Sequence, residues 1–190
     1  MRRGILQKIL ANKKNRHTLP TGLFEQKQDM TAENILFKIA TTDQEFEDGR
    51  NLFQQYAESL DLDLGFQDFS NELKTIDKQY NKPKGALLLA YKNSIPVGCV
   101  GIREFDKDAA ELKRMYVKTE YRKSKIGMKL LELIIEIAKE LNYKSIRLDT
   151  LPTMTNAQSL YRSVGFSEIP SYHFNPVSGT VFMEKKIDLK

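Results

Sequence analysis

The chain has few of the residues that build metal centres or disulfide frameworks. Its 190 residues include one cysteine, two histidines and no tryptophan. The single cysteine, Cys99, cannot form an internal disulfide, and zinc sites usually take three or four protein ligands from histidine, cysteine and carboxylates. We therefore expect no disulfide scaffold and no bound metal. The expected location is the reducing cytoplasm.

Long apolar runs are also missing. The sequence has no stretch of eighteen apolar residues, so no membrane-spanning helix and no membrane partner are predicted. With 41% hydrophobic and 29% charged residues, the composition excludes collagen-like, mucin-like and wholly disordered chains. A chain of this length is the size of one domain, which can bury a core without covalent staples.

The positive charge is concentrated at the start of the chain. Of 30 basic and 25 acidic residues, seven basic and two acidic ones fall in residues 1–32, which leaves 23 of each sign in the remainder. A neutral body weakens the case for nucleic-acid binding. We expect residues 1–32 to be a flexible extension and residues 33–190 to form one domain. A targeting peptide, or an over-long reading frame ahead of Met30, is the alternative for the extension.

Strand and helix periodicities alternate from residue 34 onward. Thr42, followed by Glu45, has the capping-box spacing that starts a helix running to about Leu60. Further helices are predicted at Phe69–Tyr80, Ile126–Leu141 and Thr155–Val164. Strands are predicted at Ile35–Ala40, Ala86–Tyr91, Pro96–Phe105, Glu111–Val117, Ser145–Thr150, Phe166–Ile169 and Thr180–Ile187. This order predicts an α/β fold, a central twisted mixed sheet flanked by helices, with one β-α-β crossover.

Residues 115–127 carry the chemistry that is easiest to interpret. A strand ends, a basic loop follows, and the longest helix begins at Ile126. Free amide groups and the positive end of the helix dipole meet there, beside Arg122, Lys123 and Lys125. The segment predicts a bound phosphate or diphosphate. An ordinary strand-to-helix connection with a solvated basic face is the alternative.

Two motifs in this chain resemble signatures of the GNAT superfamily of N-acetyltransferases. Arg122-x-x-Lys125-x-Gly127 is similar to its acyl-CoA signature, Arg/Gln-x-x-Gly-x-Gly/Ala before a long helix. Ala157-x-x-Leu160-Tyr161-x-x-x-Gly165-Phe166 is similar to its second signature, and the order of elements matches over about residues 34–190. The resemblance implies the GNAT fold and direct transfer of an acetyl group from acetyl-CoA to a primary amine of a small molecule or peptide. The sequence leaves open whether the protein forms a homodimer.

The chain departs from the family pattern at two positions. Lys125 replaces the first glycine of the diphosphate loop, where glycine tolerates unusual backbone angles. A lysine there has to offset that loss by a charged contact to phosphate. Met154 stands where many relatives carry asparagine, so Thr155 or Asn156 would have to supply that polar contact.

The resemblance also implies roles for particular residues. Tyr161 would be the general acid toward the departing thiolate, with a core aromatic as the alternative. Glu111 would be the general base, with a solvent-facing strand residue as the alternative, and His173 is the second candidate because imidazoles titrate near neutrality. Arg114, Asp149 and His173 would face the acceptor, together with Lys113. The expected cofactor contacts are Met115, Tyr116, Val117, Arg122, Lys123, Ser124, Lys125, Ile126, Gly127 and Asn156.

Other expectations concern the rest of the chain. The carboxylates Glu58, Asp61 and Asp63 would favour a cationic acceptor, unless they form a solvated face. Cys99 lies among apolar strand residues and is expected to be a small buried hydrophobe. The alternative functions are a catalytically silent acyl-CoA-binding module and, from another class, an adaptor that binds anions through its basic tail.

Overall fold

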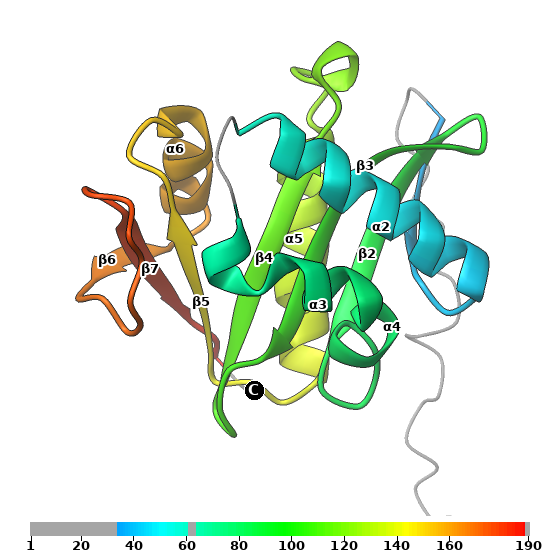
Figure 1. The fold of residues 1–190 in the computed structure, drawn as a ribbon. Coiled ribbons are helices and arrows are strands. Elements are labelled where there is room, and N and C mark those ends of the chain that lie inside the picture. Colours follow the sequence, from blue (N-terminus) through cyan, green and yellow to red (C-terminus); the bar gives the residue numbers. More distant parts are fainter. Residues whose placement is uncertain (1–33, 61–63, 189–190) are drawn as a thin grey trace, which may run out of the picture.

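A seven-stranded mixed sheet forms the centre of the protein (Figure 1). The computed structural model describes residues 34–60 and 64–188, and the expected N-terminal extension lies outside these ranges. The strand order is β1-β2-β3-β4-β5-β7-β6, and only β4 and β5 pair in parallel. The strands are β1 (Ile35–Ile39), β2 (Ala86–Lys92), β3 (Ile95–Glu104), β4 (Ala109–Val117), β5 (Ser145–Thr150), β6 (Ser167–Ile169) and β7 (Val181–Lys186). The predicted mixed sheet is confirmed.

Helices cover both faces of the sheet (Figure 1). On one face lie α2 (Asp43–Glu58), α3 (Phe69–Lys74) and α4 (Ile76–Gln79), and on the other lies α5 (Ile126–Glu140). The remaining helical elements are α6 (Thr155–Ser163) and the short 3₁₀ turns η1 (Gly65–Gln67) and η2 (Thr119–Tyr121). The helix α5 connects the two parallel strands β4 and β5, which confirms the predicted crossover. Its apolar stripe, including Leu130, Leu131 and Ile134, is fully buried.

The prediction of one helix over Phe69–Tyr80 is wrong. Thr75 has φ −119° and ψ 23°, outside the helical region, and divides the segment into α3 and α4. Its hydroxyl donates to the Asn71 carbonyl at 2.7 Å and accepts from Gln79 Nε2 at 2.7 Å. Threonine side chains compete in this way with the backbone for hydrogen bonds, and they are stiff at χ1.

The predicted capping box at the start of α2 is confirmed. The Thr42 hydroxyl accepts from the Glu45 amide at 3.3 Å, and Glu45 Oε2 accepts from the Thr42 amide at 3.0 Å. Burial raises the pKa of Glu45, but ion pairing with Lys38 and the amide donors of Thr41 and Thr42 outweigh it and hold the pKa at about 2. The carboxylate therefore fixes where α2 begins.

The sheet opens between its two parallel strands. The strands β4 and β5 pair only between residues 109–111 and 145–147, and beyond this they diverge (Figure 1). The register between β3 and β4 shifts by one residue near Arg114, which has φ +55°. Bulges bend a strand and increase its twist, so this one turns β4 away from β5. Cys99, opposite the bulge, is fully buried, as predicted; burial raises the pKa of its thiol, which donates to the Arg114 carbonyl at 3.3 Å.

Candidate active site

A cleft of about 710 Å³ occupies the opening between β4 and β5. Its walls come from β4, the start of α5, the end of β5, α6, the end of α2 and η1. Most of the residues that the sequence singled out lie along it: Arg114, Met115, Tyr116, Val117, Arg122, Lys123, Lys125, Ile126, Gly127, Asp149, Asn156 and Tyr161. The motifs therefore converge on one cavity.

The loop before α5 keeps a glycine-like backbone although it contains no glycine. Lys125, the N-cap of α5, has φ +62° and makes no side-chain cap, and Lys123 has φ +67°. A left-handed conformation costs an L-residue roughly 1–2 kcal/mol. The first-turn amides of α5 have no intrahelical acceptor, so they can bind an anion at this end of the cleft.

The basic side chains of this loop are exposed, whereas Ser124 supports the loop from within. Arg122, Lys123 and Lys125 are exposed at the cleft, and Arg122 Nε donates to the Val117 carbonyl at 3.1 Å. Ser124 Oγ donates to the Tyr121 carbonyl at 2.5 Å and is not part of the cleft wall. The loop thus offers positive charge to the cleft through three long side chains.

Tyr161 lies on α6 and reaches the cleft from the side of β5. It is 7% exposed, and its ring packs against Phe166 with 5.7 Å between ring centroids. Burial raises the pKa of Tyr161 well above the usual range of a phenol, so the hydroxyl keeps its proton at neutral pH. Within residues 34–60 and 64–188 the hydroxyl has no hydrogen-bond partner, which leaves it able to donate to a ligand. Met154 is the N-cap residue of α6, and its side chain makes no capping hydrogen bond. Thr155 and Asn156 line the cleft beside it.

Arg114 is held in a buried ion pair with Glu72. Arg114 Nη2 lies 2.6 Å from Glu72 Oε2, and the Tyr80 hydroxyl donates to Glu72 Oε1 at 2.5 Å. Burial raises the pKa of Glu72, but the Arg114 guanidinium outweighs it and holds the pKa below its usual range. The charge of Arg114 is therefore matched within the protein. Sequence reasoning missed Glu72, whose only signal is a carboxylate among the apolar positions of α3.

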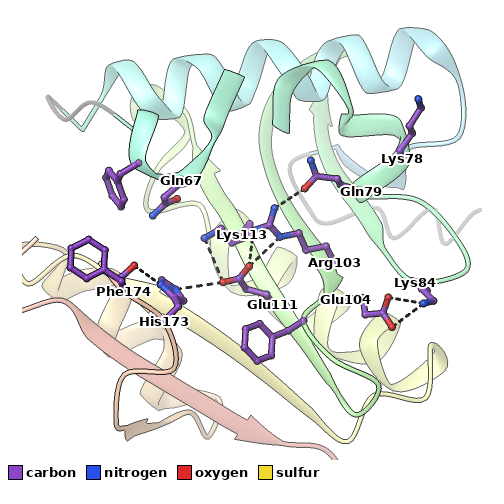
Figure 2. A pocket seen from close by; sticks show the side chains of 12 residues that line it. Gln67, Lys78, Gln79, Lys84, Arg103, Glu104, Glu111, Lys113, His173 and Phe174 are labelled. Atoms are coloured by element: carbon purple, nitrogen blue, oxygen red, sulfur yellow. Dashed lines mark hydrogen bonds and ion pairs between the residues drawn. The ribbon is translucent and has the colours of Figure 1, made fainter. Parts of the chain in front are cut away.

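A second pocket of about 560 Å³ lies beside the cleft and contains a network of charged side chains (Figure 2). Arg103 donates twice to Glu111 Oε2, at 3.1 Å from Nε and 2.9 Å from Nη2. Lys113 Nζ lies 3.6 Å from Glu111 Oε1 and 3.3 Å from Asp149 Oδ1. Glu111 is 5% exposed, which excludes the alternative that it is a solvent-facing residue. Sequence reasoning missed Arg103, which no motif marks.

His173 faces two carboxylates in this network. Its Nε2 lies 3.8 Å from Glu111 Oε1 and 4.0 Å from Asp149 Oδ1, and its Nδ1 lies 2.9 Å from the Phe174 carbonyl oxygen (Figure 2). Burial raises the pKa of Asp149, but Lys113, His173 and the amide of Asn175 outweigh it and hold the pKa below its usual range. Asp149 is therefore a carboxylate at neutral pH.

The same three side chains have the spacing of a metal site. The ligand atoms of Glu111, Asp149 and His173 all lie within 4.8 Å of one another. However, the Lys113 ammonium already contacts both carboxylates. A divalent cation would have to bind beside a positive charge, so these residues fit a metal poorly.

The cleft and the second pocket meet at one wall. Phe66, Gln67 and Lys113 line both cavities. Glu58, by contrast, is exposed and lines neither, and Asp61 and Asp63 fall outside the described residues. The cleft with its anion site and the charged pocket therefore adjoin at Phe66, Gln67 and Lys113. Among the described residues, no helix is long and apolar enough to cross a membrane.

The chain belongs to the acetyltransferase (GNAT) family, whose model matches residues 46–166. A protein of Schizosaccharomyces pombe named as an N-acetyltransferase is 35% identical over 81% of this chain and 96% of its own length. A GNAT-family acetyltransferase of Staphylococcus aureus superposes with a TM-score of 0.67 at 28% identity, covering 82% of this chain and 99% of that one. The PaiA N-acetyltransferase of Thermoplasma acidophilum, solved in complex with coenzyme A, superposes with a TM-score of 0.60 at 20% identity over 80% and 99%. The family, fold and acetyltransferase class that the motifs implied are confirmed.

Proposed function

We propose that this acetyltransferase moves an acetyl group from acetyl-CoA directly to a primary amine of a small molecule or peptide. The observation that carries the proposal is that cavities of about 710 and 560 Å³ adjoin, because Phe66, Gln67 and Lys113 line both of them. Two substrates in adjoining cavities suit transfer in a ternary complex. Holding reactants in this way replaces a bimolecular encounter with an oriented one.

Acetyl-CoA, which supplies the activated thioester, would bind in the larger cleft. Arg122, Lys123 and Lys125, with the first-turn amides of α5, would hold the diphosphate, and Ser124 would hold the loop in place. Within the described residues, β4 has no strand partner on the side of β5 beyond residue 111, so backbone groups of residues 115–117, apart from the Val117 carbonyl that Arg122 engages, are available to pair with an extended ligand. Ile126, Gly127 and Asn156 would complete the contacts. The coenzyme A bound to the Thermoplasma protein of the same fold supports this assignment.

Tyr161 would act as the general acid toward the departing sulfur. The amine forms the new N–C bond, the C–S bond breaks with its electron pair on sulfur, and the proton that the amine loses is balanced by one that the sulfur gains. Tyr161 is protonated at neutral pH, as an ordinary phenol also is, and burial, which raises its pKa, makes it a weaker acid than an exposed phenol. The same burial makes a thiolate more basic, which favours the proton transfer.

Two residues compete for the role of general base. Both oxygens of Glu111 already face donors or cations, since Arg103 binds one and Lys113 adjoins the other. If His173 Nδ1 donates to the Phe174 carbonyl, its Nε2 presents a lone pair toward the pocket. Glu111 and Asp149 would then stabilise the imidazolium formed when His173 accepts the proton. A His173→Gln variant should lose most of kcat/KM if His173 is the base, and a Glu111→Gln variant should lose it instead if Glu111 is the base.

On the acceptor side, Asp149 would attract the incoming ammonium group. Its carboxylate lines the larger cleft but not the second pocket, and it contacts Lys113, which lines both, and accepts from Asn175 Nδ2 at 2.8 Å. Arg114 would shape the acceptor side rather than bind the acceptor, because Glu72 engages its guanidinium.

The test is acetyl-CoA-dependent thiol release, measured against a chemically diverse panel of amines and paired with a calorimetric titration of coenzyme A. Coenzyme binding with amine-dependent thiol release is expected. Binding without release from any amine would contradict transfer and leave the silent-module alternative. No binding at all would contradict the assignment of the cleft.

A further inference from the structure

Exposed aromatic rings gather at the second pocket. Four large hydrophobic residues are exposed in the part of the chain that the structure describes, and three of them line this pocket: Phe66 (40%), Phe105 (38%) and Phe174 (84%). Isolated exposed hydrophobics are common, but a cluster around a concave site marks a place where an apolar ligand binds. The pocket is therefore suited to an apolar or aromatic body.

Positive charge exceeds negative charge in the lining of the same pocket. Its basic residues are Lys78, Lys84, Arg103 and Lys113, and its acidic ones are Glu104 and Glu111. Lys84 pairs with Glu104 at 2.7 Å, Arg103 pairs with Glu111, and Lys113 contacts both Glu111 and Asp149. Lys78 is exposed and has no ion-pair partner within residues 34–60 and 64–188. One positive charge in the pocket is left unmatched.

This unmatched charge lies away from the wall shared with the cleft. Figure 2 shows Lys78 and Lys84 at one end of the pocket and Gln67 and Phe174 at the other. At the shared wall, Gln67 Oε1 is buried without a hydrogen-bond partner, and Gln67 Nε2 lies 3.5 Å from Asp149 Oδ2. The negative group at this end is the Asp149 carboxylate beside Gln67, which would attract an ammonium. The two ends of the pocket thus differ in chemistry.

We propose that the acceptor is an amine with an apolar or aromatic body and a carboxylate at its far end. Its amine lies at Gln67 and Asp149, its body among the exposed phenylalanine rings, and its carboxylate at Lys78. This inference rests on the proposed function, whose acceptor class it narrows. Of the three carboxylates expected to favour a cationic acceptor, Glu58 lines neither cavity, and Asp61 and Asp63 lie outside the described residues.

The test compares 4-(aminomethyl)benzoate with benzylamine, which lacks only the carboxylate. The wild-type protein should use the benzoate with about fivefold higher kcat/KM, since one partly solvated ion contact of about 1 kcal/mol is a factor of about five. In Lys78→Ala this ratio should fall about fivefold, as expected for one partly solvated ion pair. The matched control is Lys74→Ala, which removes an exposed lysine at the end of α3 that lines neither cavity and should keep the wild-type ratio.

The outcomes of these measurements separate failure of the carboxylate subsite from failure of the proposed acetyl transfer. Equal use of the two amines, or a preference that Lys78→Ala leaves unchanged, overturns the carboxylate subsite while acetyl transfer stands. If no amine is acetylated, calorimetry of 4-(aminomethyl)benzoate in the presence of coenzyme A decides whether the carboxylate subsite exists. Binding that weakens in Lys78→Ala supports the subsite without the transfer, and absence of binding overturns it. Finally, 6-aminohexanoate should be a poorer acceptor than the benzoate, and equal use would overturn the role of the rings.

Discussion

The two cavities at the split in the sheet are built from different kinds of sequence. The larger cleft takes most of its wall from residues 112–128 and 149–161, with further lining residues in 56–60 and 64–67 and at Asn175, and it offers backbone amides and exposed cations. The second pocket gathers residues from α4, β3, β4 and the loop before β7, and its centre is a buried network of charged side chains. A ligand common to a whole family can be bound by backbone, whereas side chains from distant segments are free to vary with the acceptor.

The exposed charges of the loop and the buried charges of the networks also differ in how much their interactions contribute to the free energy of unfolding and of binding. Exposed loop cations such as Lys125 gain little from any one contact, because solvent screens them. Buried charges such as Arg114 are costly to leave without a partner. Substitutions should therefore have larger effects in the buried networks than along the basic loop, and the following predictions test that order.

The largest effect is expected at the bulge that opens the sheet. Arg114→Met leaves Glu72 charged and unpaired in the interior, which should lower the free energy of unfolding by about 3–5 kcal/mol. Urea unfolding followed by circular dichroism measures the change. The double variant Arg114→Met/Glu72→Met should recover most of the loss. A single variant as stable as wild type would mean that the pair is not buried in solution.

The next effect concerns chemistry in the cleft. Tyr161→Phe removes the proposed proton donor but keeps the ring that packs on Phe166, so kcat should fall on the order of tenfold or more. Coenzyme A affinity, measured by calorimetry, should change little. Wild-type turnover in this variant would remove the general-acid assignment.

A smaller effect is expected outside both cavities. Glu45→Gln weakens the capping box of α2 and should lower the free energy of unfolding by about 1 kcal/mol at pH 7. The folded-state pKa of Glu45 lies at about 2, below its ordinary value of 4.5, so the wild-type advantage is complete above pH 4.5 and is lost as the pH falls toward 2. Unfolding measured between pH 2 and 7 should show the two curves converge in acid, while kcat at pH 7 stays unchanged. A gap that persists at pH 2 would contradict the carboxylate as its source.

The smallest effect is expected in the basic loop. Lys125→Gly relieves the left-handed backbone and should raise the free energy of unfolding by about 0.5–1 kcal/mol. Lys125→Ala is the matched control, because it removes the same charge and keeps the strain. Equal losses of coenzyme A affinity in both variants would assign the contact to the ammonium group. A loss in the alanine variant alone would assign it to the backbone.

The sequence predicted more of the residues that line the cleft than of the residues that line the second pocket. The cleft residues follow one another in two motifs, and a strand followed by a basic loop and a helix places them together without further information. Arg103 and Gln67 carry no motif, and they meet Glu111 and Asp149 only when β3 and η1 are packed against β4 and β5. The break at Thr75 was missed because apolar spacing continues through it, whereas the threonine hydroxyl redirects the backbone.

The amino-acid sequence by itself determined the order of helices and strands, the cap of α2 and the basic loop before α5, because each depends on residues within a few positions of one another. Only the tertiary structure decided that Glu72 neutralises Arg114, that β4 parts from β5 at a bulge, and that Lys78 has no ion-pair partner in the described part of the chain. Charge pairing and burial depend on distances between segments far apart in the chain, and these distances are set when the sheet and its helices pack.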